Sequence, residues 1–187
     1  MSNHNHIALE LPNWIDSEID FKCRYADDDS RMQLAIQLAR RNVELGTGGP
    51  FGAAIFRGDG ELIAAGVNRV VPQQCSVAHA EMMAFMSAQS RLGRFRLNED
   101  GARYILATSA QPCSMCYGAS IWAGIDELVI GARADDVMAL SEFDEGPLPA
   151  DWIGELEKRA IVVRRDVLRD QARNVFELYR MHSGTSY

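Results

Sequence analysis

A pair of cysteines that follows a proline restricts the fold of this chain more than any other feature. In Pro112-Cys113-Ser114-Met115-Cys116 the proline suits the first turn of a helix, and a strand-like run over 104–108 ends just before it. Side chains three positions apart share one face of a helix, so the two sulfur atoms can hold one metal ion between them. The sequence therefore predicts a strand that leads directly into a metal-binding helix terminus.

A second motif narrows the interpretation of the cysteine pair. Alone, C-x-x-C is also typical of a thioredoxin-like redox pair or of half a structural zinc site. Here His79-Ala80-Glu81 lies 34 residues before Cys113 and also opens a predicted helix. We expect the strand-to-helix junctions at His79 and at Cys113 to direct their side chains toward the same point. Because no convincing fourth protein ligand is found, we predict a Zn²⁺ site of His79, Cys113 and Cys116 with one position open to water, as in catalytic zinc sites.

Glu81 is the candidate general acid and base. Zinc lowers the pKa of a bound water towards about 7, and a carboxylate beside that water can take its proton and return it to a substrate. In mid-helix His79 and Glu81 would lie about 200° apart, so both face one pocket only in the irregular first turn of the helix. The alternative for Glu81 is an ordinary acid at a helix N-terminus.

The periodicity of the remaining chain predicts an α/β fold. Arg57-Gly58-Asp59-Gly60-Glu61 is a hairpin signal, which makes the strands on either side antiparallel neighbours. Helices and strands alternate after this hairpin, which indicates a mixed sheet covered by helices on both faces. Helices are expected after Asp27, from near His79, over 113–123 and from Leu168 onward. The five expected strands cover 50–56, 62–70, 104–108, 127–132 and 160–163.

The length of 187 residues predicts a single domain. Residues 1–29 show no clear period, and we interpret them as an N-terminal tail or a segment that wraps around the domain formed by residues 30–187. Hydrophobic residues make up 47% of the chain and charged residues 24%, which is an ordinary globular composition.

Charge and location favour a small soluble substrate. Lys and Arg number 19 against 26 Asp and Glu, so the formal charge is −7, which argues against nucleic acids and anionic membranes as partners. No apolar run approaches the roughly 20 residues of a membrane span, and no secretory signal is evident, so we expect a cytoplasmic protein. The four cysteines are too few for a disulfide scaffold.

The order H-x-E followed by P-C-x-x-C is a signature of zinc-dependent nucleobase deaminases. On these motifs the chain resembles the cytidine deaminase-like superfamily from about Gly49 to Ala132, and within it the bacterial guanine deaminase branch. The resemblance implies a three-layer α/β/α sandwich with a five-stranded mixed sheet, and a homodimer. Gln111 departs from the pattern, because relatives often carry Glu there. Five segments carry the similarity to the guanine deaminase branch: 49–53, 68–70, 79–81, 112–119 and 143–147.

The same resemblance implies the hydrolysis of a free nucleobase, with guanine converted to xanthine and ammonia. Glu145 is then a second acid, with a solvated turn residue as the alternative. Asn68 can offer a donor and an acceptor to the edge of a base, although a residue that ends a strand would look the same. Phe51, Phe143 and Trp122 can stack on a purine, and each is otherwise a core residue.

Other functions remain open from the sequence. A tRNA adenosine deaminase would share the catalytic motif but should carry a basic surface. Cytosine, a guanine nucleoside or an aminotriazine are further substrates that the motif allows. A non-catalytic zinc scaffold would explain the three ligands but would have no use for Glu81 or for an open coordination position.

Overall fold

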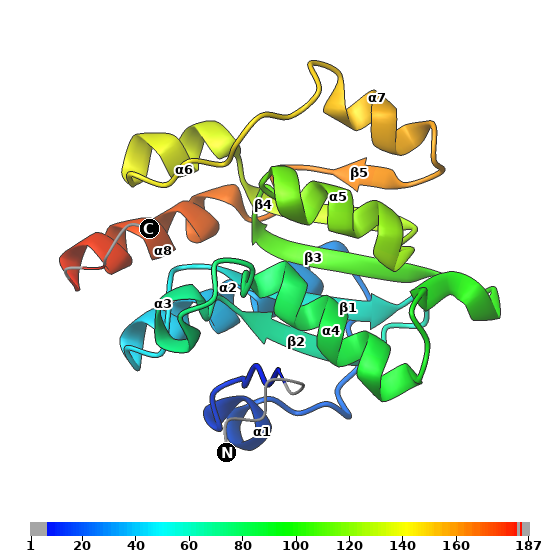
Figure 1. Cartoon of the computed structure of the whole chain (residues 1–187), viewed down its shortest axis with the longest axis horizontal. Coiled ribbons are helices and arrows are strands. Elements are labelled where there is room, and N and C mark those ends of the chain that lie inside the picture. The colour runs from blue at the N-terminus through cyan, green and yellow to red at the C-terminus, as the bar shows by residue number, and fades with distance from the viewer. Residues whose placement is uncertain (1–6, 183, 185–187) are drawn as a thin grey trace.

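Five strands form one mixed sheet in the computed structural model of this chain (Figure 1). The structure describes residues 7–182 and 184, so the first six residues of the predicted N-terminal segment lie outside it. The strand order is β2-β1-β3-β4-β5, with β1 antiparallel to β2 and β3, and with β3, β4 and β5 parallel. The predicted hairpin and mixed sheet are confirmed. The strands are β1 (Gly52–Arg57), β2 (Leu62–Val67), β3 (Tyr104–Ala110), β4 (Glu127–Ala132) and β5 (Val162–Arg164).

Helices cover both faces of the sheet and form the outer layers. Along β1, Ala54 and Phe56 pack into one apolar cluster with α2 and α8, whereas Ala53 and Ile55 pack into a second cluster with α4 and α5. This alternation follows from the two-residue period of a strand, and it confirms the three-layer α/β/α prediction. No helix in the described part of the chain is long and apolar enough to cross a membrane. The four covering helices are α2 (Asp28–Glu44), α4 (Ala80–Leu92), α5 (Ser114–Ala123) and α8 (Arg169–Met181).

The described part of the N-terminal segment is folded against the domain. Helix α1 (Trp14–Glu18) was not expected, because five residues are too few for a helical period to show. Trp14, Ile15 and Ile19 are buried in the same apolar cluster as α2. The stretch from Trp14 to Ile19 therefore packs on the core, whereas Ile7 is 90% exposed.

Some element ends differ from the sequence prediction for local reasons. The second strand stops at Val67, not at residue 70, because Asn68 Oδ1 accepts a hydrogen bond from the Val70 backbone N–H as α3 (Val70–Gln73) begins. The fifth strand starts at Val162 because Ala160 has a φ of 61°, which is incompatible with a strand. Three further short elements were not predicted: η1 (Leu97–Asp100), α6 (Ala134–Leu140) and α7 (Trp152–Glu157).

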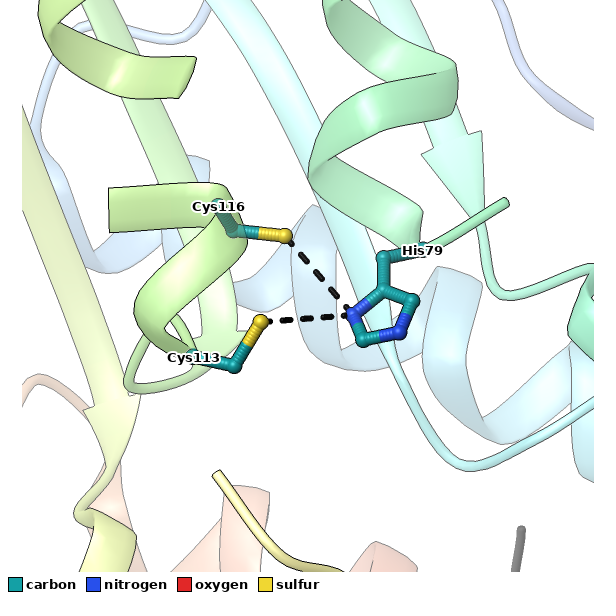
Figure 2. A group of neighbouring side chains, drawn as sticks. All are labelled: His79, Cys113 and Cys116. Atoms are coloured by element: carbon teal, nitrogen blue, oxygen red, sulfur yellow. Dashed lines mark hydrogen bonds between the residues drawn. The ribbon is translucent and has the colours of Figure 1, made fainter. Parts of the chain in front are cut away.

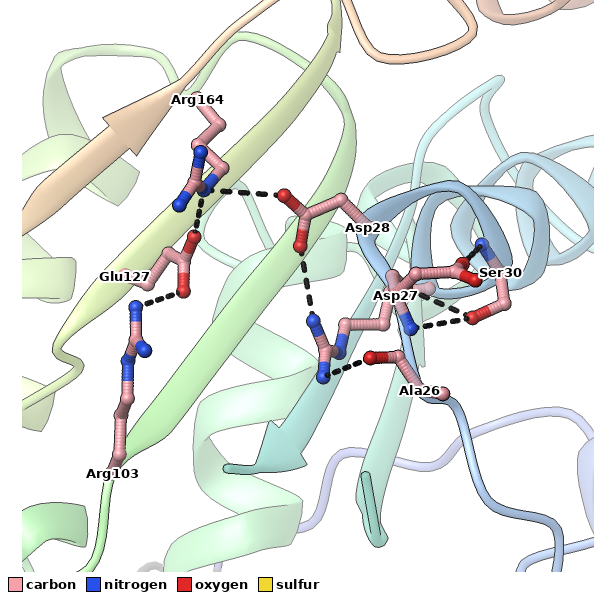
Figure 3. Close-up of polar contacts among 8 residues, drawn as sticks. Ala26, Asp27, Asp28, Ser30, Arg103, Glu127 and Arg164 are labelled. Carbon is pink, nitrogen blue, oxygen red and sulfur yellow. Dashed lines mark hydrogen bonds and ion pairs between the residues drawn. The ribbon is translucent and has the colours of Figure 1, made fainter. Parts of the chain in front are cut away.

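Charged residues tie the layers together at the end of the sheet where β4 begins (Figure 3). The carboxylate of Glu127 is paired with Arg103 and Arg164. The Arg164 guanidinium also lies 3.2 Å from Asp28 at the start of α2. In turn, Asp28 is paired with Arg31 at 3.0 Å. The network joins α2 to β4 and β5.

Candidate active site

Two helix N-termini bring the three predicted metal ligands together. His79 is the N-cap of α4 and Cys113 is the N-cap of α5, both with extended backbone angles, and Cys116 lies in the first turn of α5. His79 Nδ1 lies 3.6 Å from the Cys113 sulfur and 3.7 Å from the Cys116 sulfur (Figure 2). All three donor atoms lie within 4.8 Å of one another.

The protonation of this cluster suits a soft divalent cation. The Cys116 thiol, followed by His79, stabilises the Cys113 thiolate and lowers the pKa of Cys113 to about 4. Sharing a proton with Cys113 raises the pKa of Cys116, so the pair holds one proton that a cation would displace. One imidazole and two sulfurs are ligands that zinc prefers, and no further His, Cys, Asp or Glu within residues 7–182 or at 184 joins the group. The residues present therefore fit a zinc site with an open position.

Glu81 is buried beside the cluster and is held by a hydroxyl group. It is the second residue of α4, only 6% exposed, and burial followed by the charge of Cys113 raises the pKa of its carboxyl group. Thr108 Oγ1, on β3, lies 3.1 Å from Glu81 Oε1 and 3.0 Å from the Ala110 carbonyl oxygen. A hydroxyl has one proton, so Thr108 can donate to a Glu81 carboxylate, or donate to Ala110 and accept from a protonated Glu81. The site can thus accommodate Glu81 in both protonation states.

A small hollow opens over these residues. The rings of Phe51 and Phe143 meet edge to face at 5.1 Å and form an apolar wall, while three carboxylates provide polar groups. This combination is typical of small-molecule sites. The lining residues are Phe51, His79, Glu81, Gln111, Cys113, Phe143, Asp144 and Glu145.

Glu145 reaches the pocket because its loop lies flat against the start of α5. The Glu145 carbonyl accepts a hydrogen bond from Ser114 N at 2.9 Å. The next residue, Gly146, has a φ of 66°, and a Cβ there would lie 2.6 Å from Ser114 Oγ, so a side chain would push the loop away. Burial, followed by the charges of Glu81 and Cys113, raises the pKa of Glu145 to about 8. Glu145 can therefore hold a proton at neutral pH.

Asn68 lies beside the pocket wall rather than in its lining. Its backbone N–H donates to the Phe51 carbonyl oxygen at 3.1 Å, and its side-chain Oδ1 accepts from Val70 N at 3.2 Å. The side chain is only 1% exposed. Its Nδ2 makes no hydrogen bond with any residue that the structure describes, so this donor is available to a ligand.

Trp122, another predicted site residue, lies well away from the pocket in this chain. It is 78% exposed and lies in a separate hollow with Phe95 and Met86. Six residues along a helix turn a side chain by about 240°, so Trp122 of α5 faces away from Cys116. Within this chain it cannot stack on a base bound in the pocket.

Comparison with known proteins agrees with the geometry. The family model for the cytidine and deoxycytidylate deaminase zinc-binding region matches residues 26–132, which is more than half of the chain. The chain belongs to this deaminase family. A guanine deaminase from Bacillus subtilis (strain 168) is 37% identical over 130 residues, covering 70% of this chain and 80% of its own length.

Solved structures extend the similarity of this deaminase beyond the matched region. The guanine deaminase from Nitrosomonas europaea superimposes with a TM-score of 0.88 at 43% identity, covering 94% of this chain and 97% of its own. The NE0047 protein in complex with 2,6-diaminopurine gives a TM-score of 0.89 at 44% identity, covering 96% and 95%. The chain is therefore a zinc-dependent aminohydrolase, and its similarity to these deaminases extends over nearly its whole length.

Three polar residues in or beside the deaminase pocket receive no functional role from the sequence. Thr108 could have been found as a polar side chain near the carboxyl end of a buried strand, where ligands gather. Gln111 is 7% exposed and lines the pocket, and its departure from the family pattern was the signal. Asp144 lines the pocket, and its Oδ1 accepts a hydrogen bond from Gly146 N at 2.9 Å. The only sequence feature that indicates Asp144 is its position next to Glu145.

Proposed function

We propose that this chain hydrolyses guanine to xanthine and ammonia. The observation that carries the proposal is one hollow lined by His79 and Cys113 of the three-residue cluster, by the buried Glu81 and by the protonatable Glu145. The proposal is supported by relatives of 37–44% identity, which are guanine deaminases or were solved in complex with 2,6-diaminopurine.

The reaction forms a bond between a water oxygen and the ring carbon that bears the amino group, and breaks the bond from that carbon to the amino nitrogen. His79, Cys113 and Cys116 would hold a zinc ion, which when bound would lower the pKa of a water molecule and so make a nucleophile available at neutral pH. Glu81 takes the proton of the attacking water and returns it to a ring nitrogen, and Thr108 stays hydrogen-bonded to it in both states. Glu145, which carries a proton at neutral pH, passes it to the departing amino group, and the proton of the new hydroxyl group, released as the carbonyl of xanthine forms, returns to Glu145.

Recognition of the base uses the two walls of the pocket. Phe51 and Phe143 cover the purine faces, and the Asn68 side chain donates to the edge of the ring. Variants of NE0047 in which one asparagine or one glutamate is replaced have been solved with 8-azaguanine. Those two positions are 77 residues apart in NE0047, as are Asn68 and Glu145 in this chain.

Ammonia release from a panel of substrates tests the proposal. The panel holds guanine, guanosine, cytosine, an aminotriazine and a tRNA with adenosine at the wobble position. We expect guanine to give the highest kcat/KM, and Glu81→Gln to abolish its turnover without loss of zinc. Turnover of the tRNA with none of guanine would instead identify a tRNA adenosine deaminase, which the formal charge of −7 disfavours.

The proposed active form is a cytoplasmic homodimer that acts in purine metabolism. The four cysteines, none of them in a disulfide, suit a reducing compartment. Phe95 and Trp122 are 76% and 78% exposed in one hollow over α4 and α5, and large aromatic side chains exposed together mark association surfaces. Sedimentation should show a dimer, and Trp122→Glu together with Phe95→Glu should give a monomer. A dimer that survives both substitutions would place the interface elsewhere.

A further inference from the structure

Asn42, near the end of α2, is a fully buried polar side chain that takes no part in the metal cluster or the pocket lining. Its Nδ2 donates to the Gly49 carbonyl oxygen at 2.8 Å and to the Asn68 carbonyl oxygen at 2.9 Å. Both hydrogens of the amide are therefore used. The two carbonyls belong to separate segments, one entering β1 and one leaving β2, so Asn42 bridges them.

The other end of the Asn42 amide is fixed as well. Its Oδ1 accepts a hydrogen bond from Thr47 Oγ1 at 2.7 Å. The Thr47 oxygen in turn accepts from the indole N–H of Trp14 at 3.1 Å. Trp14 is 9% exposed and belongs to α1. A chain of hydrogen bonds thus runs from the N-terminal segment through Thr47 and Asn42 to the backbone of Asn68.

The bridged segments form one side of the proposed base site. Asn68 N–H donates to the carbonyl oxygen of Phe51, whose ring lines the pocket. Gly48 packs so closely that a Cβ there would lie 1.9 Å from the Asn68 carbonyl oxygen and 2.7 Å from Asn42 Nδ2. Gly48 therefore packs directly against the Asn68 carbonyl and the Asn42 amide, with no room for a side chain between them.

We propose that Asn42 is a positioning residue for substrate binding. Through it, helix α1 holds Asn68 in the orientation that contacts the base. The inference rests on the proposed function, because it requires that Asn68 bind the base edge. It assigns a role to the N-terminal segment, which lies far from the metal cluster in sequence. Loss of Asn42 leaves the Asn68 carbonyl oxygen without a donor, whereas the Gly49 carbonyl oxygen still accepts a hydrogen bond from Phe51 N at 2.9 Å. Asn68 then keeps its N–H bond to Phe51 and its Oδ1 bond from Val70 N, but its carbonyl is no longer tied to α2, so the residue is able to shift relative to the base.

A double-mutant cycle tests this inference in the zinc-loaded protein. We measure KM and kcat for guanine in Asn42→Ala, Asn68→Ala and the double variant, and the Kd of guanine in the same three variants on the inactive Glu81→Gln background. Asn42→Ala should raise KM and Kd about tenfold and change kcat less than twofold. In the Asn68→Ala background the same substitution should change Kd less than twofold, because the group through which it acts is gone.

A purely structural role would give a different pattern. The thermal stability of the protein should fall on Asn42→Ala in both backgrounds, so stability cannot account for a Kd effect that appears in only one. Equal Kd effects in both backgrounds, or no Kd effect in either, would overturn the inference. Asn174→Ala, at an exposed position of α8, is the matched control and should leave Kd unchanged.

Two milder variants keep the test open if Asn42→Ala does not fold. Thr47→Val removes the hydroxyl that fixes Asn42 Oδ1, and should raise Kd about threefold. Trp14→Phe removes the indole N–H together with part of the buried ring, and its effect on Kd should be in the same direction and smaller. Unchanged Kd in Thr47→Val would count against the inference. If the unmodified chain releases ammonia from guanine but Asn42→Ala leaves Kd unchanged, only the inference is refuted. If the unmodified chain releases no ammonia from guanine, the proposed function is refuted and the inference with it.

Discussion

Two buried carboxylates lie at opposite ends of the sheet. Where β4 begins, Glu127 is only 3% exposed and is paired with two arginines. At the other end, Glu81 is 6% exposed and faces a second acid, Glu145, and the Cys113 thiolate. Both carboxylates are buried, but only the first is paired with arginines. The guanidinium groups compensate the charge of Glu127, whereas burial, followed by the charge of Cys113, raises the pKa of Glu81 against the opposing effect of His79.

This contrast separates a structural charge from a functional one. A paired carboxylate holds elements together and needs nothing from outside. Acids and thiols that crowd together without a cation favour protonated states, or a metal ion, or a substrate that takes protons. The compensated end therefore stabilises the fold, and the uncompensated end performs the chemistry. Substitutions at the two ends should accordingly change different measured quantities.

The largest effect is expected from the metal ligands. Replacing Cys113 and Cys116 together by Ala removes both sulfur donors, and His79 alone cannot retain the ion. Zinc measured by elemental analysis should fall from one per chain to near zero, and ammonia release should vanish. Cys75→Ala is the control, since Cys75 lies outside the cluster, and it should keep both. Full zinc content in the double variant would show that the ligands lie elsewhere.

Glu81→Gln should lower kcat by a factor of about 10²–10⁴, the usual contribution of a general acid and base. The amide keeps the size of the side chain and can still bond to Thr108, but it cannot carry the proton. Zinc content and thermal stability should not fall, because burial of an uncharged amide removes an electrostatic cost. Glu99→Gln, on an exposed turn, should have no effect on kcat. Near-normal turnover in Glu81→Gln would assign the base to another residue.

Much of this arrangement follows from local sequence, and the rest depends on distant contacts. The strand over 127–132 was predicted with both of its ends correct. A short apolar run between polar residues fits a strand that is covered by helices on both faces. The pairing of Thr108 with Glu81 joins residues 27 positions apart, and that of Asn42 with Asn68 joins residues 26 apart. No periodic pattern encodes such contacts. Residue type alone also misplaced Trp122, although its angle around the helix from Cys116 was available from the spacing.

Glu145→Gln should lower kcat for guanine by about 10–100-fold, less than Glu81→Gln, because water can partly replace a proton relay in an open pocket. Zinc content should be unchanged, since Glu145 is not among the grouped ligands. Glu142→Gln, an exposed residue of the same loop, serves as the control. If steady-state kcat is the same in both variants, Glu145 is a loop residue only.

The raised pKa of Glu145 also predicts a pH effect on the zinc-free protein. Its ordinary value is 4.5 and burial raises it to about 8 in the folded state, so the folded protein binds the proton more tightly than the unfolded chain. That stabilisation is complete below pH 4.5 and is lost as the pH rises through 8. Thermal unfolding of zinc-stripped protein should show a lower Tm at pH 8 than at pH 6. Glu145→Gln should narrow the difference, and an unaltered difference would mean that other groups cause it.

The smallest effect on activity is expected at the compensated end. Glu127→Gln removes the charge that Arg103 and Arg164 share, but the side chains of those arginines are 51% and 54% exposed, so water solvates them once the carboxylate is gone. The free energy of unfolding should fall by about 1–2 kcal/mol, near the value of a charged hydrogen bond reduced by solvent screening. At roughly 2–4 °C per kcal/mol for a chain of this size, Tm should drop by a few degrees.

The kcat of Glu127→Gln should stay within about twofold of the unmodified chain, because no pocket-lining residue contacts this network in the described part of the chain. In the double variant Glu81→Gln, Glu127→Gln, the change in the free energy of unfolding should equal the sum of the changes in the two single variants, as expected of distant sites. A tenfold fall in kcat/KM would show that the two ends of the sheet are coupled, and the division between a structural and a functional end would then fail.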